Sequence, residues 1–157
     1  MQPVRILIVD DHEVMRGGLR SLLGSLPEWE VCGEAVDGLD AVEKAKELRP
    51  DVVVLDINMP ILNGLEAVRL IKKSAPQTQV VMLSRYEAAE MRAKALEAGA
   101  CEYVPKSQNL ARELLAAIDE IVRQRWMSNP HAQVSSTETS SEVAPPAGAK
   151  AEKVGGA

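Results

Sequence analysis

Aromatic residues are scarce in this chain of 157 residues, which contains two tryptophans, two tyrosines and no phenylalanine. A hydrophobic core must therefore be built from valine, leucine, isoleucine, methionine and alanine. Hydrophobic residues still make up 46% of the chain and charged residues 26%. This is the composition of a globular protein, and the length suits one domain of ordinary size with a short tail.

Positive charge is also in deficit, because 18 lysines and arginines face 23 aspartates and glutamates, for a formal net charge of −5. Nucleic-acid-binding domains usually carry a basic patch or stripe, so we expect no nucleic-acid binding within this chain. Long apolar runs are lacking too. The N-terminal run Val4–Val9 is too short to span a membrane and has no signal-peptide cleavage pattern, which favours a cytoplasmic protein without a membrane partner.

Cysteine is limited to Cys32 and Cys101, which stand far apart in apolar stretches. Neither cysteine has the spacing of a metal site, and the chain offers only His12 and His131 as histidine ligands. We expect two buried, free thiols that pack as small hydrophobic side chains, in preference to a disulfide or a metal site.

Short β-branched runs alternate with helical patterns along most of the chain. We expect strands at 5–9, 30–36, 52–55, 79–83 and 101–104, and helices at 13–26, 38–48, 65–74, 87–98 and 109–126. Asp37 is the expected N-cap of the second helix, and Gly99 ends the fourth. The alternation predicts an α/β fold with a doubly wound, five-stranded parallel sheet that helices cover on both faces.

The composition changes after Trp126, where serine, threonine, alanine, proline and glycine become frequent. We therefore predict one domain over residues 1–126 and a disordered tail or linker over 127–157. This tail is too short, and too poor in apolar periodicity, for a helix-turn-helix domain.

Polar side chains stand where four of the predicted strands end: Asp10 and Asp11, Asp56, Ser84, and Lys106. Each of them alone has an ordinary explanation as a turn residue, a cap or a solvated charge. Together they matter, because ligands of an open parallel sheet bind at the carboxyl ends of its strands. Three clustered carboxylates require a cation, and oxygen ligands suit Mg²⁺, with Mn²⁺ as a substitute. A carboxylate nucleophile beside a metal and a lysine suits phosphoryl transfer.

Several motifs resemble the receiver domain of bacterial two-component response regulators. The run ILIVDDHE at 6–13, with RGGL at 16–19, is similar to the subfamily that usually carries a LuxR-type helix-turn-helix output. The run VVLDINMP at 53–60, followed by Gly64, is similar to the phosphorylation motif. Ser84, Tyr103 and Lys106 match the other signature positions. The resemblance covers residues 1–125 and implies the (βα)5 flavodoxin-like receiver fold.

The resemblance implies that Asp56 accepts the phosphoryl group. It also implies that Asp11 binds Mg²⁺ directly, that Asp10 does so partly through water, and that Asp56 and the backbone carbonyl of Asn58 complete the protein ligands. The phosphoryl donor would be a histidine kinase or a phosphotransfer protein.

The remaining signature residues have implied roles in stabilising and reading the phosphoryl group. Lys106 would pair with one phosphoryl oxygen, and Ser84 would move to bond another. Tyr103 would turn inward as Ser84 moves, which would reshape the face formed by the fourth helix, fifth strand and fifth helix. That face would then bind a downstream protein or a second copy of the chain. The alternative for Tyr103 is a half-buried strand aromatic.

Two positions depart from the usual receiver pattern. The lysine is usually followed by proline through a cis bond, whereas Ser107 follows Lys106 here, and a cis bond at this point would cost about 2.5–4 kcal/mol. Arg85 and Tyr86 replace the small residue that often follows the switch hydroxyl. We expect this bulky pair to shade the phosphoryl site and to slow hydrolysis.

Three functional interpretations compete. The first is a signalling module, either complete in itself or separated from a DNA-binding half that regulates transcription. In this interpretation the chain is not an enzyme, beyond self-catalysed phosphorylation and dephosphorylation. The second is a Mg²⁺-dependent phosphatase with an aspartate nucleophile, which usually needs a second aspartate where this chain has Asn58. The third is a degenerate receiver that only binds protein.

Overall fold

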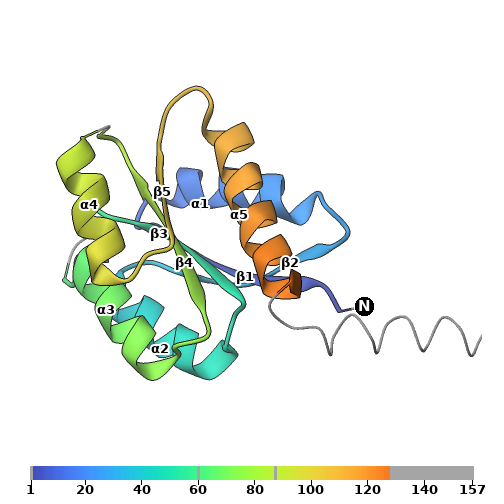
Figure 1. Cartoon of the computed structure of the whole chain (residues 1–157), viewed down its shortest axis with the longest axis horizontal. Helices are drawn as coiled ribbons and strands as arrows, with labels where there is room; N and C mark the ends of the chain where they lie inside the picture. Colours follow the sequence, from blue (N-terminus) through green and yellow to red (C-terminus); the bar gives the residue numbers. More distant parts are fainter. Residues whose placement is uncertain (1, 60, 87, 128–157) are drawn as a thin grey trace, which may run out of the picture. The chain divides into compact units, whose positions relative to one another are not determined.

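The structure is a computed structural model that describes residues 2–59, 61–86 and 88–127. Residues Gln2–Ile121 form one compact unit. Its five strands are β1 (Val4–Val9), β2 (Trp29–Ala35), β3 (Val52–Asp56), β4 (Gln79–Ser84) and β5 (Glu102–Pro105). They form a single parallel sheet in the order β2-β1-β3-β4-β5 (Figure 1). This confirms the predicted five-stranded parallel sheet.

Five helices connect and follow the strands: α1 (Glu13–Gly24), α2 (Gly38–Leu48), α3 (Gly64–Ser74), α4 (Ala89–Ala98) and α5 (Leu110–Met127). Helices α2, α3 and α4 lie on one side of the sheet, and α1 and the first turns of α5 lie on the other (Figure 1). The order reverses between β1 and β3, so that the switch point of the doubly wound sheet lies between these two strands.

The core consists of short aliphatic side chains, as the shortage of aromatic residues requires. Every residue of β3 is buried, as are the last four residues of β1. This matches strands that helices cover on both faces and that therefore need no polar side. Of the core residues in the described part of the chain, only Trp29 and Tyr103 are aromatic.

Local signals fix the ends of several helices. The Asp37 carboxylate accepts a hydrogen bond from the Asp40 amide at 2.8 Å, which confirms the predicted N-cap of α2. Gly99 has φ +122° at the end of α4, a conformation that non-glycine residues rarely adopt. A Cβ atom on Gly64 would stand 2.6 Å from the Asp56 carbonyl oxygen. Only glycine therefore allows α3 to begin this close to the end of β3.

The structure differs from the predicted elements in a few places. Helix α1 ends at Gly24, two residues early, and α4 begins at Ala89. Cys101 was predicted to be buried but is exposed, because it precedes β5 and only its Sγ turns back to donate to the Val80 carbonyl at 3.3 Å. Cys32 is partly buried, and neither thiol forms a disulfide.

The predicted tail, apart from Met127, lies outside the described residues, so the boundary after residue 126 remains a prediction. Helix α5 runs on through Met127. Within the described ranges, no helix combines the length and the apolar character that crossing a bilayer requires.

Candidate functional site

The predicted site residues come from four strand ends at one edge of the sheet. Asp10 follows β1, Asp56 is the last residue of β3, Ser84 is the last residue of β4, and Lys106 follows β5. All four strands are parallel, so their carboxyl ends meet at the same edge. The edge includes the switch point between β1 and β3, where open α/β sheets bind their ligands.

Lys106 bridges two buried carboxylates. Its Nζ lies 3.0 Å from Asp10 Oδ2 and 3.3 Å from Asp56 Oδ2. The three side chains are 12%, 0% and 4% exposed, respectively. Charges this well shielded from water are costly unless they are paired. The ammonium group of Lys106 therefore holds together two carboxylates that would otherwise repel each other. We call Asp10, Asp11, Asp56 and Lys106 the acceptor site, after the role that the resemblance predicts for Asp56.

The position of Asp10 is fixed from several sides. Its Oδ1 accepts a hydrogen bond from the His12 amide at 2.8 Å, and its carbonyl accepts one from the Arg16 guanidinium at 2.9 Å. Arg16 in turn pairs with Glu34 at 3.2 Å. Hydrogen bonds from Arg20 and Arg16 hold the pKa of Glu34 below its usual value, so that it stays ionised beside them. These contacts orient Asp10 without using its Oδ2, which remains for Lys106.

The environment of Asp56 disfavours its ionised form. Burial raises the pKa of Asp56; the charge of Lys106 opposes this effect, and that of Asp10 adds to it. The amide of Asn58 donates to Asp56 Oδ1 at 3.2 Å and favours ionisation. An additional cation near Asp10 and Asp56 would therefore stabilise the carboxylate form, which is the nucleophilic one.

Four side chains offer ligand atoms within 4.8 Å of one another: Asp10, Asp11, His12 and Asp56. Three of them supply carboxylate oxygens, which are the ligands that Mg²⁺ and Mn²⁺ prefer. The residues present thus fit a hard divalent cation. The backbone carbonyl of Asn58 belongs to the loop directly after Asp56, and its role as a further ligand remains a prediction.

His12 is the member of this cluster that the sequence analysis did not assign to the site. Its Nδ1 lies 3.2 Å from Asp11 Oδ1 and 3.3 Å from Asp10 Oδ1. Its place directly after two carboxylates at a strand end was a usable signal, because a residue there stays at the same edge of the sheet. Nothing in the sequence around Arg16 indicated that its guanidinium would bond to the Asp10 carbonyl.

Ser84 and Tyr103 meet at the backbone of Tyr86. The buried Ser84 hydroxyl accepts a hydrogen bond from the Tyr86 amide at 3.1 Å. The Tyr103 hydroxyl donates to the Tyr86 carbonyl, and its ring is 2% exposed. Tyr103 is therefore fully buried in this structure. In the described part of the chain, no hydrogen bond joins Ser84 to Asp56.

The two unusual positions of the sequence have defined local structures. The described residues contain no cis peptide bond, so Lys106 and Ser107 are joined in trans. The Lys106 amide donates to the Ser84 carbonyl, which places the lysine beside the end of β4. The Tyr86 side chain is 60% exposed, and that of Arg85 is exposed as well. Their expected effect on hydrolysis remains a prediction.

Comparison with known proteins identifies the class of this fold and site. Residues 6–119 match the family described as the response regulator receiver domain. The chain belongs to this family. Receiver domains bind Mg²⁺ at an acidic pocket and interact with kinases and other proteins, and this chain has a cluster of aspartates at the corresponding edge of its sheet.

The relatives differ in the output that their names describe. A protein-glutamate methylesterase/protein-glutamine glutaminase of Pyrococcus abyssi is 46% identical over 76% of this chain and 33% of its own length. The crystal structure of the response regulator domain of Thermotoga maritima CheB is 42% identical with a TM-score of 0.73, over 78% of this chain and 98% of that one. A LuxR-family two-component response regulator from Aurantimonas is 35% identical with a TM-score of 0.74, over 78% of this chain and 87% of that one.

These relatives correct one expectation. The prediction that the protein is not an enzyme is wrong as stated, because several curated relatives at 42–46% identity are named as methylesterases and glutaminases. This chain spans about a third of their length, namely 33–38%. The prediction was drawn from the motifs of the receiver region alone, and these motifs carry no information about the activity of a whole protein. A LuxR-type output is not shown.

Proposed function

We propose that Asp56 is the phosphoryl acceptor of this receiver domain and that its donor is a histidine kinase or a phosphotransfer protein. The observation that carries the proposal is the position of Lys106 Nζ, between Asp10 Oδ2 at 3.0 Å and Asp56 Oδ2 at 3.3 Å. The ammonium group of Lys106 can pair with an incoming phosphoryl oxygen while the Asp56 carboxylate loses its negative charge in forming the new bond.

The transfer forms one bond and breaks one. An Asp56 carboxylate oxygen attacks the phosphorus of a phosphohistidine; the phosphorus–nitrogen bond breaks, and its electron pair returns to the imidazole. The product is an acyl phosphate on Asp56. In this proposal Lys106 pairs with one phosphoryl oxygen, and the Ser84 hydroxyl leaves the Tyr86 amide to donate to another.

The Mg²⁺ site proposed here consists of Asp10, Asp11, Asp56 and the carbonyl of Asn58, with Mn²⁺ as a substitute. A bound divalent cation supplies positive charge that offsets the carboxylates and the phosphoryl oxygens. Asp10 is already committed to Lys106 and the His12 amide, which agrees with a contact to the metal through water. Asp11 has more free surface and suits a direct contact.

The proposed switch links Ser84 to Tyr103 through one peptide unit. Ser84 Oγ holds the Tyr86 amide, and the Tyr103 hydroxyl holds the carbonyl of the same residue. If Ser84 moves toward a phosphoryl group, it releases the Tyr86 amide. The backbone at Tyr86, to which the Tyr103 hydroxyl is bonded, then changes position. The altered face comprises α4, β5 and α5, and its target is a downstream protein or a second copy of the chain.

The output beyond this face is also a proposal. The likeness to the LuxR-family regulator favours a role in transcription through a DNA-binding part, whereas the methylesterase relatives, of which the chain spans about a third, favour a catalytic part. The length of the gene distinguishes the two. A cytoplasmic location follows from the proposed kinase partner.

The test is incubation with acetyl phosphate and Mg²⁺, followed by intact mass measurement. We expect a phosphate adduct of about 80 Da on the wild-type chain and none on Asp56→Asn. The matched control is Asp51→Asn, directly before β3, which should be phosphorylated like the wild type. An adduct that survives in Asp56→Asn would contradict the proposal, as would its absence from the wild type.

A further inference from the structure

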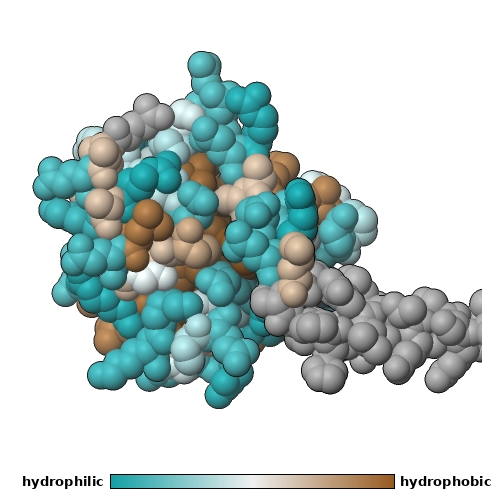
Figure 2. Space-filling model, in the orientation of Figure 1, coloured by the Kyte–Doolittle hydropathy of each residue, from teal (hydrophilic) through white to brown (hydrophobic). Residues whose placement is uncertain are grey.

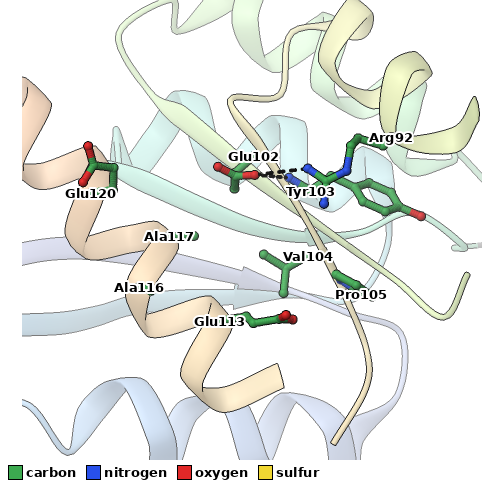
Figure 3. A pocket seen from close by; sticks show the side chains of 9 residues that line it. All are labelled: Arg92, Glu102, Tyr103, Val104, Pro105, Glu113, Ala116, Ala117 and Glu120. Atoms are coloured by element: carbon green, nitrogen blue, oxygen red, sulfur yellow. Dashed lines mark hydrogen bonds and ion pairs between the residues drawn. The ribbon is translucent and has the colours of Figure 1, made fainter. Parts of the chain in front are cut away.

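A groove runs between β5 and α5 on the proposed output face. Its volume is about 320 Å³, and Val104, Pro105, Ala116 and Ala117 contribute apolar surface to it. In Figure 3 the short side chain of Ala117 points from α5 toward β5 across the groove, which Ala116 also lines. Figure 2 shows hydrophobic surface in the hollow between α4 and α5, surrounded by hydrophilic residues.

The charges on this groove are mainly negative. Glu102 on β5 and Glu113 and Glu120 on α5 line it, and Arg92 on α4 is the one cation among the lining residues. Arg92 is paired with Glu102 at 3.4 Å. Glu113 forms no ion pair within the described part of the chain. The groove therefore combines an apolar wall with three carboxylates, of which Arg92 pairs with that of Glu102.

The spacing of the two α5 carboxylates sets a geometric requirement. Glu113 and Glu120 are two helical turns apart, which is about 10 Å at the rise of an α-helix. The alanines Ala116 and Ala117 lie between them. A helix that packs along α5 can place cations at the same interval with small or apolar side chains between them, and nucleic acid would be repelled.

Arg92 connects the groove to Tyr103. Its guanidinium lies 5.4 Å from the centre of the Tyr103 ring while it pairs with Glu102 (Figure 3). Arg92 thus occupies the position that a cation from outside would take against Glu102. It also lies over the tyrosine that is hydrogen-bonded to the segment altered by the proposed switch, so that a change at Tyr103 would alter the charge the groove presents.

We propose that the groove formed by Arg92, Glu102, Val104, Glu113, Ala117 and Glu120 binds a helical segment of a partner protein that carries lysine or arginine side chains two turns apart. We call it the α5 groove. Arg92 competes with the incoming cations for Glu102. The inference rests on the proposed function for its link to phosphorylation, whereas the binding itself depends only on the groove.

The test uses two fluorescein-labelled peptides of alanine and glutamine, each of about 15 residues, a length at which isolated helices become marginally stable. One peptide carries two arginines two turns apart, and its twin carries the same two arginines side by side. Anisotropy at low ionic strength, where exposed charges are least screened, gives the dissociation constants. We expect the spaced peptide to bind and its twin to bind less tightly.

Variants on the two sides of the groove should act in opposite directions. Glu113→Gln and Glu120→Gln should each weaken binding of the spaced peptide by about two- to fivefold, the range of one exposed ion pair. Arg92→Met keeps a side chain over Tyr103 but removes the competing charge, and should tighten binding by a similar factor. Glu43→Gln, on α2 outside the groove, makes the same charge change and should have no effect.

Each outcome decides for or against the groove. The inference fails if neither peptide binds, if the twin binds as tightly as the spaced peptide, or if Glu113→Gln behaves like Glu43→Gln. Peptide titrations on chain treated with acetyl phosphate and Mg²⁺, together with intact mass measurement, distinguish failure of the groove from failure of the proposed function. A mass adduct without groove-dependent peptide binding contradicts the proposed role of the groove and leaves the phosphoryl-acceptor role standing. Groove-dependent peptide binding without a mass adduct contradicts the phosphoryl-acceptor role and leaves the proposed role of the groove standing.

Discussion

The acceptor site and the α5 groove both combine carboxylates with a single basic side chain, yet they differ in exposure. In the acceptor site, Lys106 is 12% exposed between carboxylates that are 0% and 4% exposed. In the α5 groove, Arg92 and Glu102 are 47% and 44% exposed. Exposed pairs contribute little to stability, whereas breaking a buried pair is expensive. The same residue types therefore serve the fold and its chemistry in one place and recognition in the other.

Removing the basic side chain from the acceptor site should give the largest effect on stability. We expect Lys106→Met to lower the free energy of unfolding by about 3–5 kcal/mol, because it leaves two buried carboxylates without their counter-charge. Urea denaturation in metal-free buffer measures the loss. Lys46→Met, an exposed lysine on α2, should change it by about 0.5 kcal/mol or less. Equal losses in the two variants would remove the distinction between buried and exposed pairs.

Magnesium should stabilise the fold through the acceptor site. A ligand that binds only the folded chain adds about 2.7 kcal/mol at a hundred times its dissociation constant. We expect a gain of this order for the wild type in a Mg²⁺ titration followed by urea denaturation. Asp11→Asn should lose most of the gain, and Glu43→Gln should keep it. If Asp11→Asn gains as much as the wild type, Mg²⁺ binds elsewhere.

The pH dependence of stability should reveal the cost of ionising Asp56. Its pKa is raised, chiefly by burial, so the ionised carboxylate is less favourable in the folded chain than in the unfolded one. At neutral pH and without metal, Asp56→Asn should therefore be more stable than the wild type by roughly 1 kcal/mol.

This advantage of Asp56→Asn should shrink as the pH falls through the raised pKa of Asp56 towards the unfolded value of about 3.9. The difference between the two proteins isolates Asp56, because the lowered pKa of Glu34 affects both alike. Urea denaturation at several pH values supplies the comparison. A difference that does not change with pH would show that the charge of Asp56 is not its source.

The smallest effect on stability is expected at the α5 groove. Glu113→Gln should change the free energy of unfolding by about 0.5 kcal/mol or less, because Glu113 forms no ion pair within the described residues. A larger loss would show that Glu113 serves the fold, and that the two regions differ less than their exposure indicates.

Much of the architecture could be predicted from the sequence because the physical signals were local. Buried runs such as 52–55 predicted strands, and the alternation with helices predicted a parallel sheet. That topology by itself brings Asp10, Asp56 and Lys106 to one edge. The Asp37 cap depends on a side chain bonding to an amide three residues away, which a sequence pattern can encode.

The remaining features depend on contacts between distant segments. Lys106 could have pointed to solvent, and only the packing of its loop turns it towards Asp10, 96 residues away. The burial of Tyr103 depends on the carbonyl of Tyr86 in another loop. The exposure of Cys101 depends on where β5 begins. The α5 groove results from small residues that look like ordinary helix formers in the sequence.

The most direct test of the central claim locates the phosphoryl group by chemistry. Borohydride reduces an aspartyl phosphate to homoserine and releases phosphate, and tandem mass spectrometry of the digested chain then identifies the residue. After treatment with acetyl phosphate and Mg²⁺, we predict homoserine at position 56 and unmodified aspartate at positions 10 and 11. Homoserine at position 10 or 11, or none at position 56, would contradict the assignment of Asp56 as the acceptor.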